Sequence, residues 1–155
     1  MMEPTAIKSI HLPIGGIEVV RESAVITTVL GSCVSICLFD EKRGIAGINH
    51  YMLPSPNGDK VFPVGRFGET SIAELVKRVT HAGSCAADLT AKIFGGAKML
   101  SQFSNFNGIS EANIEVAQNL MKQYNIRVVA SDVGGNRGRK ILFHTDTGRV
   151  FVKQV

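Results

Sequence analysis

The chain has 155 residues, of which 45% are hydrophobic and 19% charged. This size and composition predict a globular chain that forms one domain over residues 1–155, and they exclude an intrinsically disordered protein. The formal net charge of +4 and the pI near 9.1 favour acidic partners. Because this excess is well short of a nucleic-acid-binding signature, we expect no nucleic-acid partner.

The chain has three cysteines, Cys33, Cys37 and Cys85. This number is too small and too odd for a disulfide framework, which favours a reducing compartment. The first residues are broken by charge, proline and glycine, so they do not resemble a signal peptide. No window approaches the roughly 18 apolar residues needed to cross a bilayer. We therefore expect a cytoplasmic protein without membrane insertion.

In the first third of the chain, runs rich in β-branched residues predict strands. They cover residues 7–20 (one or two strands around Gly15-Gly16), 23–30, 33–39 and 45–53. The turn-forming segment 40–44 joins the last two. The sequence therefore predicts an antiparallel hairpin with Cys33 on one strand and His50 on the other.

The remaining segments mix helices with strands. Residues 54–69 contain three prolines and three glycines and predict a long surface loop, a kind of segment that is often functional. Apolar residues at helical spacing predict a helix capped near Thr70 or Ser71 and a second helix from Ser110. Strands are predicted at 90–95, 126–130 and 140–144 and after the turn at 146–148, with a Gly/Arg loop at 132–139. The fold class is therefore α/β, with a mixed, largely antiparallel sheet.

The segment TTVLGSCVSICLF, residues 27–39, contains the first chemical candidate. Gly31-Ser32 interrupts an apolar strand directly before Cys33. A sharp turn there would leave backbone N–H groups near the sulfur, around Ser32, where an oxyanion needs donors. The alternative is that Cys33 is a small hydrophobic core residue, since free cysteine is among the most buried residue types.

His50 could activate the thiol, because histidine is the usual base beside a nucleophilic cysteine. In a simple hairpin ladder, position 50 lies roughly opposite position 34, within reach of Cys33. The alternative is a histidine with only a structural hydrogen bond. A threonine hydroxyl on a neighbouring strand could orient the imidazole, and spacing does not choose between Thr27 and Thr28.

Two other patterns in the sequence have more than one interpretation. Cys33, Cys37 and His50 could suggest a zinc site, but residues four apart on a strand are separated by about 13 Å, so we expect no metal. The segment VGGNRGRK, residues 133–140, lacks the order of a phosphate-binding loop. It is either a turn with a solvated basic tip or a contact for an anion or an acidic partner through Arg137, Arg139 and Lys140.

Three segments resemble the CheD family of chemoreceptor glutamine deamidases. They are TTVLGSCVSICLFDEKRGIAGINHYMLP, AKIFGGAKM and SDVGGNRGRKILFHTDTGRVFVK, in that order, and the resemblance extends from about residue 21 onward. It implies that Cys33, His50 and Thr27 are the catalytic residues. It also implies a single CheD-like domain with an α/β/α layered fold. One departure is the stretch 109–113, which lacks the arginine that the family often has there.

The resemblance implies that Cys33 attacks the carboxamide of receptor glutamines and that a thioester intermediate is hydrolysed to glutamate, without a cofactor. The expected partners are the cytoplasmic helices of methyl-accepting chemoreceptors and a CheC-type phosphatase. A different interpretation is a non-catalytic regulatory module that binds the phosphatase and receptors. A cysteine peptidase would share the chemistry but would need an open substrate cleft, which the strand pattern does not predict.

Overall fold

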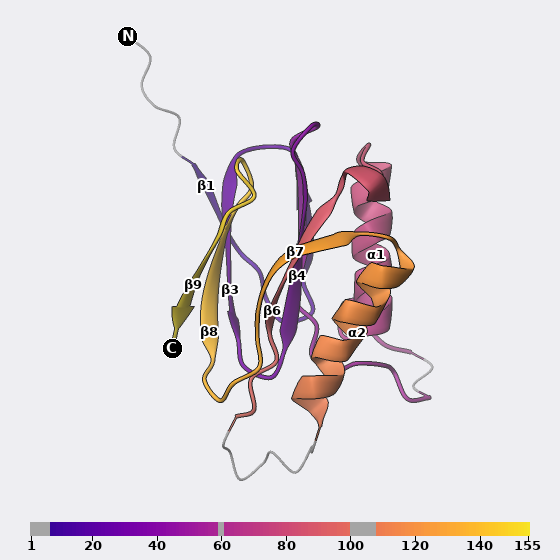
Figure 1. The fold of residues 1–155 in the computed structure, drawn as a ribbon, viewed down its shortest axis with the longest axis vertical. Coiled ribbons are helices and arrows are strands. Elements are labelled where there is room, and N and C mark those ends of the chain that lie inside the picture. Colours follow the sequence, from indigo (N-terminus) through magenta and orange to yellow (C-terminus); the bar gives the residue numbers. More distant parts are fainter. Residues whose placement is uncertain (1–6, 59–60, 100–107) are drawn as a thin grey trace.

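The computed structural model describes residues 7–58, 61–99 and 108–155. The strands form two sheets (Figure 1). The four-stranded sheet has the order β1 (Lys8–His11), β3 (Ala24–Leu30), β8 (Arg139–His144), β9 (Val150–Gln154). The five-stranded sheet has the order β2 (Ile17–Val20), β5 (Ile45–Asn49), β4 (Val34–Asp40), β6 (Thr90–Gly95), β7 (Arg127–Val133). The helices are α1 (Gly68–His81), α2 (Ile109–Gln123) and the short 3₁₀ helix η1 (Ala86–Asp88).

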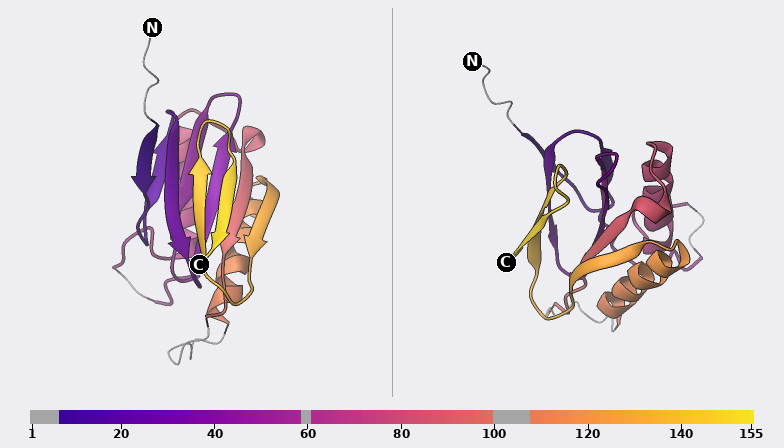
Figure 2. Two further views of the ribbon diagram at one scale, coloured as in Figure 1. Left: turned by 90° about the vertical axis from the view of Figure 1, so that its left-hand side faces the viewer. Right: turned by 45° about the horizontal axis from the view of Figure 1, so that its top comes forward.

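The two sheets face each other, and α1 and α2 both cover the outer face of the five-stranded sheet (Figures 1 and 2). The predicted α/β sandwich with mixed, largely antiparallel pairing is confirmed, since only the β1–β3 and β6–β7 pairs are parallel among the described strands. The order of layers differs from helix–sheet–helix: it is sheet, sheet, helices.

The alternation of side chains along β4 explains the layer order. Val34, Ile36 and Leu38 pack into the core that includes the helices, while Cys37 packs into a second core between the sheets. Both faces of this strand are therefore buried, one by helices and the other by the four-stranded sheet. In β3, buried and more exposed residues alternate, which is typical of a strand with one face toward solvent.

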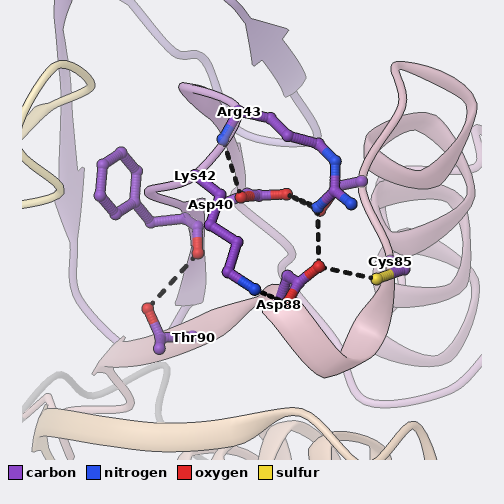
Figure 3. Close-up of polar contacts among 8 residues, drawn as sticks. Asp40, Lys42, Arg43, Cys85, Asp88 and Thr90 are labelled. Atoms are coloured by element: carbon purple, nitrogen blue, oxygen red, sulfur yellow. Dashed lines mark hydrogen bonds and ion pairs between the residues drawn. The ribbon is translucent and has the colours of Figure 1, made fainter.

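The predicted hairpin is confirmed: β4 and β5 pair antiparallel, with Cys37 opposite Ile48. A polar cluster braces its turn, at the end of the hairpin away from Cys33 (Figure 3). The buried Asp40 carboxylate accepts hydrogen bonds from Ser84 Oγ at 2.6 Å and from Arg43 Nη1 at 2.8 Å. The same Arg43 atom contacts Asp88 at 2.8 Å, which ties the turn to η1. This cluster fixes the hairpin and hence its register.

One local prediction was wrong. Helix α1 begins at Gly68 with Phe67 as its N-cap, and no side chain caps it. Thr70 instead donates to the carbonyl of Val64, and Ser71 is buried, where its hydroxyl accepts from Asn49 Nδ2. The helix can begin earlier because Gly68 packs against the Tyr51 ring, where a Cβ would lie 2.8 Å from a ring carbon. Within the described ranges, no helix has the length and apolar character needed to span a membrane.

Candidate active site

The candidate nucleophile lies in the turn between β3 and β4. Cys33 is partly exposed there, and its thiol is free. The carbonyl of Gly31 accepts from the Ala97 N–H, and that of Cys33 accepts from the Gly96 N–H, both at 2.9 Å. At Gly95, with φ of +109°, an added Cβ would lie 2.2 Å from the Cys33 carbonyl oxygen. The end of β6 therefore holds the turn at a distance that only glycine permits.

The hairpin register places Cys33 and His50 on one face of the five-stranded sheet. Val34 pairs with Tyr51 and Cys37 with Ile48, so the continuing ladder puts Ser35 opposite His50. The predicted pairing was displaced by one residue. Since side chains alternate between faces, Cys33 is the next residue on the face of Ser35 and His50. This face points into the space between the two sheets, where Cys33 packs against the second core.

A hydroxyl on β3 orients the imidazole. Thr28 Oγ1 lies 2.7 Å from His50 Nδ1 and 2.8 Å from the carbonyl oxygen of Leu12. A hydroxyl has one hydrogen, and the carbonyl can only accept, so Thr28 donates to Leu12 and accepts from Nδ1–H. The neutral imidazole therefore carries its hydrogen on Nδ1, and Nε2 has a free lone pair.

The residue that contacts His50 is Thr28, not Thr27. Ile26, Thr28 and Leu30 are the buried residues of this part of β3, and Thr27 alternates with them, half-buried on the opposite face. Thr27 therefore does not make the contact with the imidazole that was expected of it. Residues one apart on a strand point to opposite sides, so only one of the two threonines can reach into the space between the sheets.

The Nε2 atom of His50 is buried and has no hydrogen-bond partner among the described residues, Cys33 included. The thiol is thus a neighbour on the same face without a formed hydrogen bond. Catalytic hydrogen bonds are often long in the absence of substrate and tighten in the complex. An unpaired basic nitrogen on the face that also carries the thiol meets the first requirement for proton abstraction from that thiol.

Burial keeps both groups neutral. It lowers the pKa of His50 to about 4, and the nearby His11 adds a smaller effect in the same direction. Burial also raises the pKa of the Cys33 thiol, although the residue's own backbone N–H partly offsets this by favouring the thiolate. Near neutral pH the pair is a thiol and a neutral base, so the proton would leave as the sulfur attacks.

The turn at Cys33 carries backbone N–H groups without carbonyl partners among the described residues. Within the described part of the chain, the N–H groups of Ser32 and Cys33 donate to no backbone carbonyl. The Ser32 carbonyl, in contrast, accepts a hydrogen bond from Asn113 Nδ2 at 3.0 Å. The turn can therefore offer N–H donors to an oxygen atom near Cys33, as expected from the break at Gly31-Ser32.

The two arginines of the β7–β8 loop have different environments. Arg137 is exposed, and its guanidinium lies 3.3 Å from the Gln154 side chain. Arg139 is only 5% exposed, and its guanidinium binds the Asp132 carboxylate and carbonyl and the Gly134 carbonyl. The expectation that Arg139 contacts a partner is therefore not supported: both terminal nitrogens of its guanidinium are used to hold the loop.

Cys37 is fully buried among apolar residues, and burial raises the pKa of its thiol. Among the described residues, no group of three His, Cys, Asp or Glu side chains is arranged to hold a metal ion. Cys37 thus has the environment of a core residue.

The comparisons agree with the motifs. The family model described as CheD chemotactic sensory transduction matches residues 52–154. A relative from Trichlorobacter lovleyi, named a probable chemoreceptor glutamine deamidase CheD, is 43% identical over 89% of this chain and 85% of its own length. The chain belongs to the CheD family. Similarly named relatives are 42% identical in Sulfurimonas denitrificans (85% of each chain) and 39% identical in Anaeromyxobacter dehalogenans (94% of this chain, 84% of its own).

Asn113 is a residue of this CheD-family chain that the sequence reasoning missed. It lies on the buried face of α2, with Ser110, Ala117 and Met121. A polar residue at a position that helical spacing assigns to the apolar stripe was the available signal. For Thr28, the available signal was the alternation of residues between the two faces of β3. It identifies Thr28 only when the inward face of the strand is known.

Proposed function

We propose that this CheD-family chain is a glutamine deamidase that acts on chemoreceptors. The activity is the one in the names of relatives at about 40% identity, and the chain covers 84–85% of their length. The observation that carries the proposal is the unprotonated Nε2 of His50, buried and unpartnered among the described residues, on the sheet face that it shares with Cys33. This arrangement supplies a nucleophile and a base, as amide hydrolysis requires.

In the proposed reaction, the Cys33 sulfur attacks the side-chain carboxamide carbon of a glutamine as the thiol proton passes to His50 Nε2. Backbone N–H groups of the Ser32–Cys33 turn bind the oxyanion. His50 then gives the proton to the leaving nitrogen, so that ammonia departs and a thioester remains. His50 next deprotonates a water molecule that attacks the thioester. Glutamine and water become glutamate and ammonia, the thiol is regenerated, and no cofactor is consumed.

Thr28 takes the orienting role in this proposal. Its hydroxyl oxygen accepts the Nδ1 hydrogen and so keeps the lone pair on Nε2, the atom that must take the thiol proton. The same contact would stabilise the imidazolium formed after proton transfer.

The proposed substrate is a glutamine on a cytoplasmic helix of a methyl-accepting chemoreceptor, which places the reaction in the cytoplasm. Each turnover adds one negative charge to the receptor. Because a surface charge pair is worth only about 0–1 kcal/mol, several sites would be needed to shift a signalling helix bundle strongly. The new carboxylates would be available as methyl acceptors.

The test is incubation with a receptor cytoplasmic fragment, followed by peptide mass spectrometry of amide-to-acid conversion. The wild type should convert discrete glutamines and Cys33→Ala should convert none. Cys85→Ala is the matched control, because that thiol is exposed and contacts Asp88 beside the hairpin turn. Conversion that survives in Cys33→Ala, or none with the wild type, would refute the proposal. Binding that persists in both without conversion would indicate a regulatory module.

We also propose a CheC-type phosphatase as a partner, with Arg137 in the contact. The support is the family membership and the exposure of the Arg137 side chain, in contrast to the buried Arg139. Arg137→Glu should weaken phosphatase binding in isothermal titration calorimetry, because it reverses a charge at the interface. An unchanged affinity would exclude Arg137 from the contact.

A further inference from the structure

One buried side chain of α2 connects both halves of the candidate site. Asn113 is 0% exposed, and its Nδ2 donates to the carbonyl oxygens of Ser32 and Met52, each at 3.0 Å. Ser32 precedes the nucleophile, and Met52 lies two residues beyond His50. A single amide group thus holds the turn of Cys33 and the segment after His50 in a fixed relation.

The orientation of this amide follows from its partners. Carbonyl oxygens only accept, so the NH₂ group must face them, and the amide oxygen must point the other way. That oxygen is buried without a donor among the described residues, which is an unfavourable arrangement. The main-chain carbonyl of Asn113 accepts a further hydrogen bond from the Tyr51 hydroxyl. The two carbonyl contacts are therefore what this polar residue provides in a position otherwise suited to an apolar one.

The contact with Ser32 has a geometric consequence for Cys33. The Ser32 C=O and the Cys33 N–H belong to one planar trans peptide and point in opposite directions. Since Asn113 holds the carbonyl toward α2, the Cys33 N–H is directed away from α2. This N–H is close enough to its own sulfur to favour the thiolate. It is thus placed where an oxygen bonded to the attacked carbon would develop charge.

We propose that Asn113 is a positioning residue that orients the Ser32–Cys33 peptide so that the Cys33 N–H binds the oxyanion. The proposal deepens the proposed function, on which it rests for the identity of the natural substrate. It requires only that Cys33 attacks a carbonyl carbon. Asn113 itself touches neither the sulfur nor the substrate and acts through the peptide that it holds.

The test compares two reactions of Cys33 in a Cys85→Ser background. Acylation by p-nitrophenyl acetate passes through an oxyanion, whereas alkylation by iodoacetamide does not. The variants are Asn113→Ala and Asn113→Leu, the second of which fills the space without a donor. Ser110→Ala is the matched control: it removes a buried hydrogen bond of the same helix, from Ser110 Oγ to the Ala97 carbonyl at 2.7 Å, which does not involve Ser32 or Met52.

Both Asn113 variants should acylate at least about 10-fold more slowly. Loss of an oxyanion donor typically slows a reaction 10²–10³-fold, and a donor that is only misdirected should cause part of that loss. The alkylation rate of these variants should stay within about twofold of the wild-type rate. Ser110→Ala should change neither the acylation rate nor the alkylation rate by more than about twofold. With a receptor fragment, kcat should fall while KM is retained. Equal losses in both reactions, or an acylation loss no larger than in Ser110→Ala, would overturn the proposal. A wild type that acylates normally but does not deamidate the receptor would refute the proposed function alone.

Discussion

Replacement of His50 by glutamine should remove a specific part of the protein's acid sensitivity. The imidazole is 1% exposed and neutral in the folded protein, because burial lowers its pKa from 6.5 to about 4 and His11 adds to the effect. As the pH falls below 6.5, the unfolded chain takes up a proton that the folded protein still refuses. The folded state is therefore destabilised as the pH falls, until it too is protonated near pH 4.

The magnitude follows from the two pKa values. One pKa unit corresponds to about 1.36 kcal/mol, so the interval from 6.5 to about 4 corresponds to at most about 3.4 kcal/mol in the free energy of unfolding. The loss attributable to His50 is nearly zero above pH 7, about 2 kcal/mol at pH 5 and about 3 kcal/mol at pH 4. A glutamine does not titrate, so the variant should lack this part of the pH dependence.

The assay is urea unfolding of the wild type and His50→Gln at intervals from pH 7.5 to 4. The difference between the two unfolding free energies, followed over this pH range, reports the contribution of His50 together with its coupling to His11. It should shift by about 3 kcal/mol in favour of the variant as the pH falls. Parallel curves for the wild type and His50→Gln would refute the reasoning that burial keeps the imidazole neutral.

Two further predictions concern the residues that hold the site. Thr28→Val should lower kcat for receptor deamidation about 10–100-fold through loss of the productive tautomer. Thr27→Val, on the other face of β3, is the control and should change kcat less than about twofold. A larger loss in Thr27→Val than in Thr28→Val would restore the assignment of Thr27. Gly95→Ala should destabilise the protein by more than about 2 kcal/mol in urea unfolding, because the backbone strain of a positive φ adds to the 2.2 Å clash with the Cys33 carbonyl. Gly44→Ala, with φ of +66° and nothing within 4 Å, carries the backbone strain alone, so equal losses in the two variants would contradict the clash.

The pH dependence of the reaction gives one more prediction. Since the pKa of His50 is about 4, the acid limb of kcat/KM should lie well below the pKa of a free imidazole, and activity should persist at pH 5.5. Measurement between pH 4 and 8 in short assays, with enzyme returned to pH 7.5 afterwards to check for unfolding, tests this. An acid limb near 6.5 would mean that the base is solvated in the free enzyme, which would contradict its burial.

Much of the site could be predicted because it depends on local sequence. The turn signal at 40–44 between two apolar runs predicts the hairpin, and a hairpin fixes which residues of its strands are neighbours. Cys33 and His50 could therefore be predicted to be neighbours on one sheet, to within one residue of register. The order of the motifs was enough to indicate the family.

Contacts between segments distant in sequence could not be predicted in the same way. The choice between Thr27 and Thr28 depends on which face of β3 lies toward the other sheet, and alternation alone does not say which face is inward. The role of Asn113 depends on α2 packing beside the β3–β4 turn, more than 80 residues away in the chain. The contact between Arg139 and Asp132 spans only seven residues, but it joins β8 to β7 and so depends on how the two sheets pack.

The sequence by itself determined the α/β class, most strands, both helices and the hairpin with its candidate nucleophile Cys33 and candidate base His50. The reason is that periodicity and turn chemistry act over a few residues. Only the tertiary structure decided the sheet–sheet–helix order, the tautomer of His50, the contact with Thr28 and the anchoring by Asn113. The physical reason is that these depend on which faces become buried together. Burial sets both the pKa of the imidazole and the direction of the hydrogen bonds that surround it.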